Sequence, residues 1–183
     1  RILPSINLAY NISDRLLIRG AYGKTLNRPE FREISPTYFY DFLFNSINVG
    51  NNELRTASVD NFDLRCEFYP RPGENITIGT FYKKFIDPIE MYFIPGVGSG
   101  GTRSITWGNA AQAVNYGIEL EIRKKLDSLN VPVIKNLGIV ANGAWIRSVI
   151  DLDSANVGNS NQQRPMMGQS PWIINAGLFY QND

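Results

Sequence analysis

The sequence predicts an all-β protein, an antiparallel up-and-down meander that forms a fragment of a large transmembrane β-barrel. Apolar residues recur at every second position in segment after segment, which is the period of a strand with one apolar face. Most segments are close to the roughly 9–11 residues that a tilted strand needs to cross a bilayer, and they are longer than the usual strand of about five or six residues. Their connections alternate between short and long, as they do in outer-membrane barrels.

The first three predicted strands, at residues 3–10, 15–26 and 59–69, alternate regularly. Their apolar faces consist of Pro4, Ile6, Leu8 and Tyr10; of Leu16, Ile18, Tyr22 and Leu26; and of Phe62, Leu64, Cys66 and Phe68. Polar residues such as Asn7, Arg19 and Asp63 occupy the positions between them. Each of these strands therefore has one apolar and one polar face.

Four more strands are predicted at residues 75–86, 115–126, 137–150 and 171–180. The strand at 75–86 is less regular, because Ile76 and Ile78 lie on one face and Phe81 and Phe85 on the other. The stretch NYGIELEIRKKL at 115–126 is the clearest, with Tyr116, Ile118, Leu120 and Ile122 opposite Asn115, Glu119, Glu121, Arg123 and Lys125. About seven strands are expected in total.

The links between these segments indicate how the strands are connected. Tight turns are predicted at 11–14 (NISD) and 70–74 (PRPGE), and a shorter link at 127–136. Long connections are predicted at about 27–58, 87–113 and 151–170. In a meander, this alternation places all the long loops at one end and all the tight turns at the other.

Two kinds of protein share this alternating pattern. In an outer-membrane barrel the apolar faces contact lipid and the polar faces line a wet lumen. Aromatic residues at the strand ends favour the barrel, since such residues gather at membrane interfaces: Tyr10, Tyr69, Tyr82, Tyr116, Trp145, Trp172 and Tyr180. The alternative is a soluble β-sandwich binding module, such as a carbohydrate-binding domain, with its apolar face turned inward.

The composition excludes several functions for this chain. It contains no histidine and one cysteine, so catalytic triads that use histidine, the HExxH zinc site and a cysteine zinc site are ruled out within it. A net charge of +1 and the lack of a basic patch interleaved with aromatics give no reason to expect nucleic acid. We predict no enzymatic activity, no cofactor and no metal.

Four stretches, in order along the chain, carry a resemblance to a known family. They are LIRGAYGKTLNRPEFREISP (17–36), NVGNNELRTASVDNFDLRCEFYP (48–70), NYGIELEIRKKL (115–126) and RPMMGQSPWIINAGLFYQND (164–183). They resemble the carboxy-terminal half of the barrel of TonB-dependent outer-membrane transporters, especially those of Bacteroidetes. Two positions depart from the family pattern: Asn52 replaces the usual proline, and Ala57 stands where an acidic or polar residue is common.

The resemblance implies a barrel of about 22 strands closed by an amino-terminal plug. Residues 1–183 would be a partial barrel domain of about seven strands, without the plug and the final strands. The implied function is uptake of a scarce nutrient (a metal chelate, vitamin or glycan) across the bacterial outer membrane. The implied partners are outer-membrane lipid, the TonB complex through the amino-terminal region, and a surface lipoprotein.

Candidate site residues follow from this prediction. Charged residues expected to face the lumen are Asp63, Arg65, Glu67, Glu119, Glu121 and Arg123, and an ion-pair network there is favoured over a catalytic carboxylate pair. Residues expected to contact a ligand or partner from the extracellular loops are Phe31, Tyr38, Phe39, Tyr40, Phe42 and Arg164. The alternative for the aromatic residues is packing within the base of their own loop. Cys66 is expected to face lipid.

Overall fold

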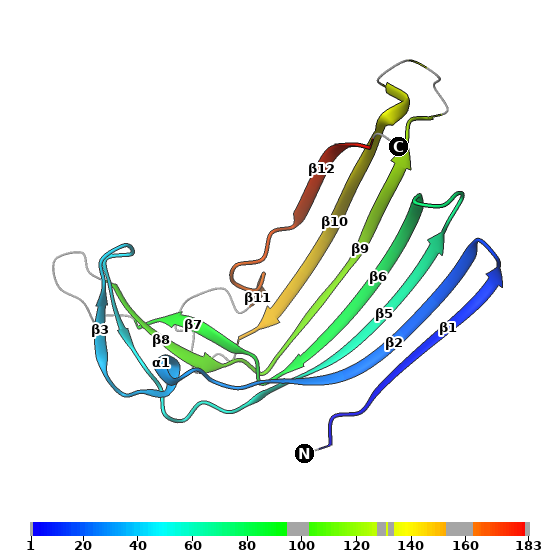
Figure 1. Ribbon diagram of the computed structural model, residues 1–183. Helices are drawn as coiled ribbons and strands as arrows, with labels where there is room; N and C mark the ends of the chain where they lie inside the picture. Colours follow the sequence, from blue (N-terminus) through cyan, green and yellow to red (C-terminus); the bar gives the residue numbers. More distant parts are fainter. Residues whose placement is uncertain (1, 95–102, 128–130, 132–133, 153–162, 182–183) are drawn as a thin grey trace.

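The computed structural model describes residues 2–94, 103–127, 131, 134–152 and 163–181. Seven long strands lie side by side in one antiparallel sheet (Figure 1). They are β1 (Ser5–Ser13), β2 (Leu16–Asn27), β5 (Ala57–Phe68), β6 (Asn75–Ile86), β9 (Gln112–Lys125), β10 (Leu137–Asp151) and β12 (Trp172–Tyr180). Each corresponds to one predicted strand, so the predicted antiparallel meander is confirmed.

The tight turns and the long connections lie at opposite ends of this sheet, as the alternation predicted (Figure 1). Two boundaries differ most: β9 begins at Gln112, three residues before the predicted start at 115, and the first turn is shorter than predicted. The first turn was placed at 11–14, but β1 continues to Ser13, with an irregular register between Asn11 and Ser13. Only Asp14 and Arg15 form the turn itself. The second predicted turn, at 70–74, is confirmed.

The long connections contain a second, four-stranded sheet that the sequence analysis treated as loop. Its strands are β3 (Tyr38–Asp41), β4 (Ser46–Val49), β8 (Arg103–Asn109) and β7 (Ile89–Phe93), in this spatial order. Because β4 and β8 come from different loops and pair in parallel, the first two long loops form one structure. A short helix, α1 (Phe31–Ile34), precedes β3, and β11 (Gln163–Arg164) extends the edge of β10.

One face of the large sheet, here called the outer face, is apolar across all seven strands. Register places apolar residues beside one another from strand to strand, for example Ile18 beside Cys66, and Cys66 beside Ile78. Many of these side chains are exposed: Ile6, Leu8, Tyr10, Phe62, Leu64, Phe68, Ile76, Ile78, Tyr82, Ile118, Leu120, Trp172, Ile174, Leu178 and Tyr180. A continuous exposed apolar surface of this kind requires a partner or a lipid environment.

Aromatic rings form a row across the outer face near the loop end. The row consists of Tyr22, Phe62, Tyr82, Tyr116, Trp145 and Trp172, on six strands. Ring centroids are 4.9 Å apart for Tyr22 and Phe62, and 6.2 Å apart for Trp145 and Trp172. On β12, Tyr180 lies near the turn end of the sheet. The step of eight residues from Trp172 to Tyr180 spans about 26 Å along the strand, which at the usual tilt of barrel strands corresponds to about 20 Å along the membrane normal. Aromatic residues thus lie near both ends of the outer face, as they do at the two interfaces of a membrane.

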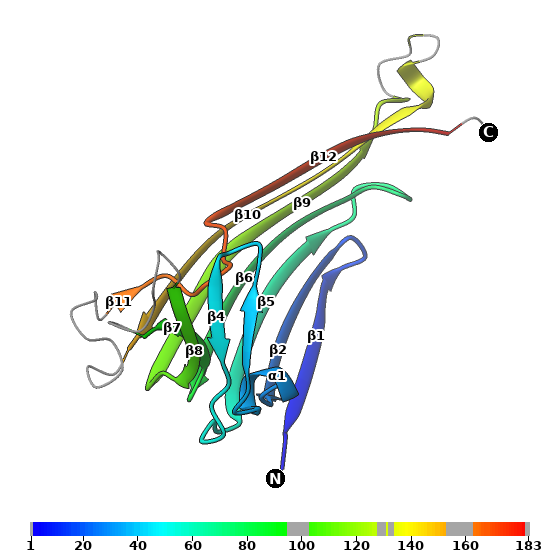
Figure 2. The same ribbon diagram turned by 90° about the vertical axis from the view of Figure 1, so that its left-hand side faces the viewer.

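The opposite, inner face of the large sheet is covered by the long loops only at the loop end. There Tyr92 of β7 packs with Ala113 of β9 and Ile150 of β10, the last of which is fully buried. Phe85 and Met166 pack against the same cluster. Figures 1 and 2 show the small sheet at this end and, among the residues that the structure describes, no second layer over the rest of the inner face. Among the described residues, no helix has the length and apolar character needed to cross a membrane.

Candidate functional site

The six charged residues predicted to face a lumen share the inner face of the large sheet. They are Asp63, Arg65 and Glu67 of β5 and Glu119, Glu121 and Arg123 of β9. Strand β6 lies between β5 and β9, so Gly79 pairs with both Arg65 and Glu119. The structure therefore brings these residues together on the face opposite the apolar one. Their contact with a lumen stays a prediction.

Glu67 is the most buried carboxylate of this group, with only 6% of its surface exposed. It accepts a hydrogen bond from Nε of Arg19 at 3.1 Å and another from the hydroxyl of Tyr69 at 2.7 Å. The sequence analysis placed Arg19 on the polar side of its strand but did not include it or Tyr69 among the site residues. The alternation of polar and apolar residues could have placed Arg19 on the same face as Glu67. The contact of Tyr69 with Glu67 depends on the path of the chain after the end of β5, which the alternation does not predict.

A polar groove with a volume of about 260 Å³ lies beside this pair on the inner face. Its polar lining includes Arg65, Thr77, Glu119, Glu121 and Asn142. Within it, Arg65 and Glu121 form a long ion pair of 4.0 Å. Because Gly79 has no side chain, the ends of the neighbouring charged side chains keep room over β6. The groove carries charges of both signs, which suits a hydrated polar surface better than a catalytic pair.

The candidate contact residues of the long loops separate into exposed and packed aromatic residues. Phe31, Tyr38, Tyr40 and Phe42 are exposed, as are Leu43 and Phe44 next to them. Phe39 is not fully exposed: its ring lies 6.3 Å from that of Trp107, and the guanidinium of Arg32 lies 4.7 Å above it. Packing within the loop base therefore describes Phe39, while the other rings are available for contact.

The tip of the β3–β4 hairpin presents three consecutive apolar side chains to solvent. Phe42 is 86% exposed, Leu43 91% and Phe44 73%. Hydrogen bonds fix the turn beneath them, because Oδ1 of Asp41 accepts the amide N–H groups of Leu43 at 2.9 Å and Phe44 at 3.3 Å. Asn45, in the left-handed region at φ 47°, completes the turn. These hydrogen bonds therefore fix the backbone of the tip, while the three apolar side chains remain exposed.

Arg164 joins two of the long loops. Its Nη2 lies 2.9 Å from Oε2 of Glu90, a carboxylate that is only 5% exposed. Arg164 also lines a cavity of about 380 Å³ with Arg147, Gln163 and Gln169. The ion pair with Glu90 offsets the positive charge of Arg164. Ligand contact by Arg164 stays a prediction, whereas its role in joining the two loops is what the structure shows.

The sequence matches a known family over the full length of the chain. The model of the family described as "TonB dependent receptor-like, beta-barrel" matches residues 1–183. The chain belongs to this family. Its members lie in the outer membrane of Gram-negative bacteria and are transporters, not enzymes. Among curated proteins, none matches the chain.

Solved TonB-dependent receptors have a similar fold. The siderophore receptor PirA from Pseudomonas aeruginosa matches with a TM-score of 0.58 and 21% identity, over 82% of this chain and 27% of that one. PirA from Acinetobacter baumannii matches with a TM-score of 0.61 and 16% identity, over 98% of this chain and 26% of that one. A variant of the ferric enterobactin receptor PfeA from Pseudomonas aeruginosa, in complex with enterobactin, matches with 0.62 and 16%, over 99% and 26%.

The chain spans about a quarter of the length of these solved receptors. At this identity the likeness shows the fold alone. It supports the prediction of a partial β-barrel, while the division into a barrel part and absent plug and final strands stays a prediction. In TonB-dependent receptors, as in other outer-membrane barrels, the long loops face the outside and the tight turns face the periplasm.

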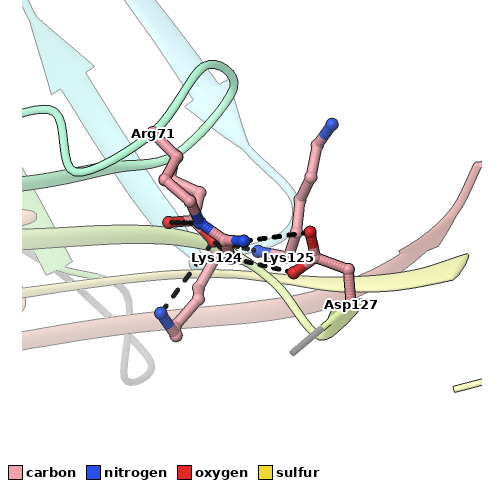
Figure 3. Close-up of polar contacts among 5 residues, drawn as sticks. Arg71, Lys124, Lys125 and Asp127 are labelled. Carbon is pink, nitrogen blue, oxygen red and sulfur yellow. Dashed lines mark hydrogen bonds and ion pairs between the residues drawn. The ribbon is translucent and has the colours of Figure 1, made fainter. Parts of the chain in front are cut away.

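The periplasmic end of this receptor barrel carries a charged cluster that the sequence analysis missed (Figure 3). Glu74 follows a turn in which Gly73 adopts φ 82°, and its side chain is only 1% exposed. Arg71 donates to Glu74 from Nη2 at 2.6 Å and to Asp127 at 2.8 Å, so it connects the β5–β6 turn to the end of β9. Glu74 also accepts the amide N–H of Lys125 at 3.1 Å.

The hydrogen bonds from Arg71 hold the pKa of Glu74 below its ordinary value, and those from Glu74 and Asp127 raise the pKa of Arg71. The two groups therefore stay charged at neutral pH. A cluster that ties two neighbouring turns together is suited to fixing the periplasmic rim of the sheet. It does not resemble a metal site, and no group of three or more potential metal ligands occurs in the part of the chain that the structure describes.

Proposed function

We propose that the intact receptor takes up a scarce nutrient (a metal chelate, a vitamin or a glycan) across the outer membrane, with energy supplied through the TonB complex. The observation that carries this proposal is the two-faced sheet together with the position of its loop layer. The outer face is apolar, the inner face is charged, and the second sheet packs on the inner face at the extracellular end. Ligand captured by that layer would lie at the entrance to a polar path.

The hairpin tip supports capture by contact rather than by chemistry. Phe42, Leu43 and Phe44 offer apolar surface on a turn whose backbone is fixed by Asp41, so little conformational freedom is lost when a ligand or partner binds. Tyr40, edge-on to Phe42 at 4.8 Å between centroids, adds ring surface to the same tip, while its hydroxyl donates a hydrogen bond to Oδ1 of Asn45. Aromatic residues of this kind dominate many recognition surfaces.

The charged inner face supports passage of a hydrated solute past the sheet. Its ion pairs, Arg19 with Glu67 and Arg65 with Glu121, leave both signs of charge available to the solute or to a plug. We assign plug and TonB contacts to other parts of the receptor. A surface lipoprotein is a further partner that the exposed tip would fit. No catalytic step and no cofactor enters this mechanism.

The similar solved proteins suggest where to begin. Two are described as siderophore receptors and one as a ferric enterobactin receptor. Iron chelates are therefore the first of the three nutrient classes to test, before vitamins and glycans.

The test is uptake by cells that lack only this receptor. The parent strain, the deletion strain and the complemented deletion strain would each be given radiolabelled ferric enterobactin, cyanocobalamin or a labelled oligosaccharide in turn. We expect the deletion strain to lose uptake of one compound and complementation to restore that uptake. A protonophore should abolish uptake of the same compound in the parent strain. Uptake of every compound at the parental rate would contradict the nutrient classes proposed, and uptake insensitive to the protonophore would contradict coupling through TonB.

The soluble β-sandwich module considered from the sequence does not fit the structure. A sandwich buries its apolar faces between two sheets, whereas the outer face of this sheet is exposed along its whole length, and the family assignment places it in the outer membrane. The small sheet packs on the other, polar face and only at one end.

A further inference from the structure

Asn109, the last residue of β8, makes three hydrogen bonds that join the small sheet to the large one. Its Nδ2 donates to the backbone oxygen of Asp87 at 2.7 Å and to that of Arg55 at 2.9 Å. Its Oδ1 accepts the amide N–H of Arg55 at 2.7 Å. Arg55 lies just before β5 and Asp87 just after β6, so one side chain connects β8 to the ends of two neighbouring strands of the large sheet.

These hydrogen bonds lie where the chain passes from one sheet to the other. Strands β6 and β9 pair along the large sheet, and their continuations β7 and β8 pair again from Ile89 and Asn109. Between the two ladders, Asp87 adopts the left-handed region at φ 54°, and the amide N–H of Ala110 donates to the backbone oxygen of Pro88 at 2.8 Å. The β7–β8 hairpin therefore continues the β6–β9 hairpin beyond a bend, and Asn109 fixes that bend.

Further hydrogen bonds tie the first long loop to β8. Nδ2 of Asn51 donates to the backbone oxygen of Trp107 at 3.0 Å, and its amide N–H donates to the backbone oxygen of Glu33 in α1 at 2.6 Å. The hydroxyl of Thr106 donates to the backbone oxygen of Val49 at 2.9 Å, beside the parallel pairing of β4 with β8. Helix α1 and the small sheet thus form one unit, here called the loop unit.

The loop unit covers the loop end of the inner face and carries the hairpin tip. Tyr92 of the unit packs with Ala113 and Ile150 of the large sheet, which are 1% and 0% exposed. The same unit holds Phe42 and Phe44 at the tip of the β3–β4 hairpin. The angle at the bend therefore decides both how well the inner face is covered and where the tip lies.

We propose that Asn109 is a positioning residue for ligand capture, because it locks the loop unit to the large sheet so that the first two long loops cover the inner face as one rigid body. An amide side chain suits this place, since it offers donors and an acceptor at once to backbone groups at the ends of two strands. The ion pair of 2.6 Å between Arg55 and Asp87 spans the same place, but the arginine side chain is 68% exposed, so it contributes little.

Loss of the Asn109 hydrogen bonds should let the loop unit lift locally from the large sheet, while the barrel itself stays folded. The benefit to ligand capture rests on the proposed function, because a tip at a fixed position loses less freedom when a ligand binds. The covering of the inner face does not depend on which nutrient is taken up. Failure of the lock and failure of the proposed nutrient classes can therefore be distinguished.

The experiment measures the opening of the loop unit on cells that carry the intact receptor. Ala113→Cys places a reporter beneath Tyr92, in a receptor whose other cysteines, Cys66 included, are replaced by serine. A membrane-impermeant sulfonated maleimide is the probe, and Leu43→Cys, at a position that is 91% exposed, gives the rate without protection. We expect the reporter to react much more slowly than Leu43→Cys. Asn109→Ala should raise the reporter's rate at least roughly tenfold, because three hydrogen bonds are lost.

Two variants separate the lock from a general loss of stability. Asn109→Asp keeps the size of the side chain and the acceptor for Arg55 but loses both donated hydrogen bonds, so it should also raise the reporter's rate. Asn61→Ala is the matched control, since Asn61 also donates to a backbone oxygen, that of Gly23 at 2.9 Å, but within the large sheet. It should leave the reporter's rate unchanged.

Heat-modified migration on gels would show that each variant is folded before the rates are compared. Equal reporter rates with and without Asn109 would overturn the proposal. So would equal acceleration by Asn61→Ala, which would show that any loosening of the sheet exposes the reporter. A reporter that reacts as fast as Leu43→Cys while Asn109 is intact would also overturn it, because the inner face would then not be covered.

Discussion

Nε of Arg19 lies 3.1 Å from Oε1 of Glu67, and this ion pair joins β2 to β5 on the inner face of the sheet. The two side chains differ in environment: that of Glu67 is 8% exposed and that of Arg19 is 52% exposed. The other carboxylate oxygen of Glu67 accepts the hydroxyl of Tyr69 at 2.7 Å. Glu67 is therefore the buried acceptor of a small hydrogen-bond network, and Arg19 is a donor whose side chain remains half-exposed to solvent.

Replacement of Glu67 by alanine should lower the stability of the receptor by about 1–3 kcal/mol, because the Tyr69 hydroxyl loses its acceptor and Arg19 loses its counter-ion. Arg19→Ala should cost less, about 0–1 kcal/mol, because the side chain that is removed is half-exposed and Glu67 keeps its hydrogen bond from Tyr69. Asp63→Ala, on the same strand and face but with an exposed side chain, is the control. Thermal unfolding in detergent would measure all three, and equal effects of Glu67→Ala and Asp63→Ala would contradict the network.

Glu74 predicts a pH dependence at the periplasmic end. Its pKa is lowered from an ordinary value of 4.5, chiefly by the hydrogen bonds from Arg71. A carboxyl group with a lowered pKa in the folded state contributes stability above its unfolded pKa and loses it as the pH falls through the folded pKa. Stability from this cluster should therefore be present at neutral pH and lost below pH 4.5.

The measurement compares the wild type with Glu74→Gln at neutral pH and at about pH 3. At neutral pH the variant should unfold at a lower temperature, since Arg71 and the amide of Lys125 lose a charged acceptor. As the pH falls below 4.5 the difference between the two proteins should shrink, because the wild-type carboxyl gains a proton as the pH passes through its lowered pKa. A difference that stayed constant between the two pH values would show that burial, and not charge, accounts for the effect of Glu74.

The sequence predicted the long strands well, because each of them exposes one face to an apolar and one to a polar environment. Period two follows directly from such a contrast, and the stretch around Glu119 and Glu121 shows it most clearly. Strand β6 was harder, since Phe81 and Phe85 lie on the inner face. Phe85 packs there under the loop layer, and Phe81 lies over Gly117. The apparent irregularity of β6 is thus a consequence of local packing.

The small sheet could not be predicted from the same pattern. Its strands β3 and β4 have four residues each, too few to establish a period, and β4 pairs in parallel with β8 from another loop. Non-local pairing of this kind leaves no signal in either segment alone. The aromatic content of the first loop did indicate a recognition surface, but only the structure separates packed Phe39 from exposed Phe42. The glycine-rich run at 96–101, part of the long connection predicted at 87–113, lies outside the described residues.

Gly117 predicts a second stability difference, on β9. A Cβ atom there would overlap the backbone oxygen of Trp145 and approach the Phe81 ring to 2.8 Å. The backbone oxygen cannot move without disturbing the β9–β10 ladder, so Gly117→Ala should destabilise the receptor by about 1–3 kcal/mol. Gly177→Ala, on β12, is the matched control, because nothing lies within 4 Å of its added Cβ.

Thermal unfolding would compare these two glycine variants with the wild type. The Gly177 variant should stay within about 0.5 kcal/mol of the wild type. If both variants lost the same stability, general intolerance of the sheet to side chains at glycine positions would explain the result, and a specific close approach at Gly117 would not.

The loop aromatic residues should divide into a binding pair and a structural residue. Phe42→Ser together with Phe44→Ser removes exposed apolar surface from the hairpin tip and leaves the Asp41 hydrogen bonds to the backbone in place. We expect at least roughly tenfold weaker ligand binding, as for central contact residues of an interface, with little change in thermal stability.

Phe39→Ala should instead lower stability, since the ring packs near Trp107 and beneath Arg32. Binding by isothermal calorimetry with the nutrient identified in the uptake assay, and unfolding of the same preparations, would measure both effects. Wild-type affinity in the double tip variant would assign ligand capture to another loop, because neither Phe42 nor Phe44 would then contribute to it.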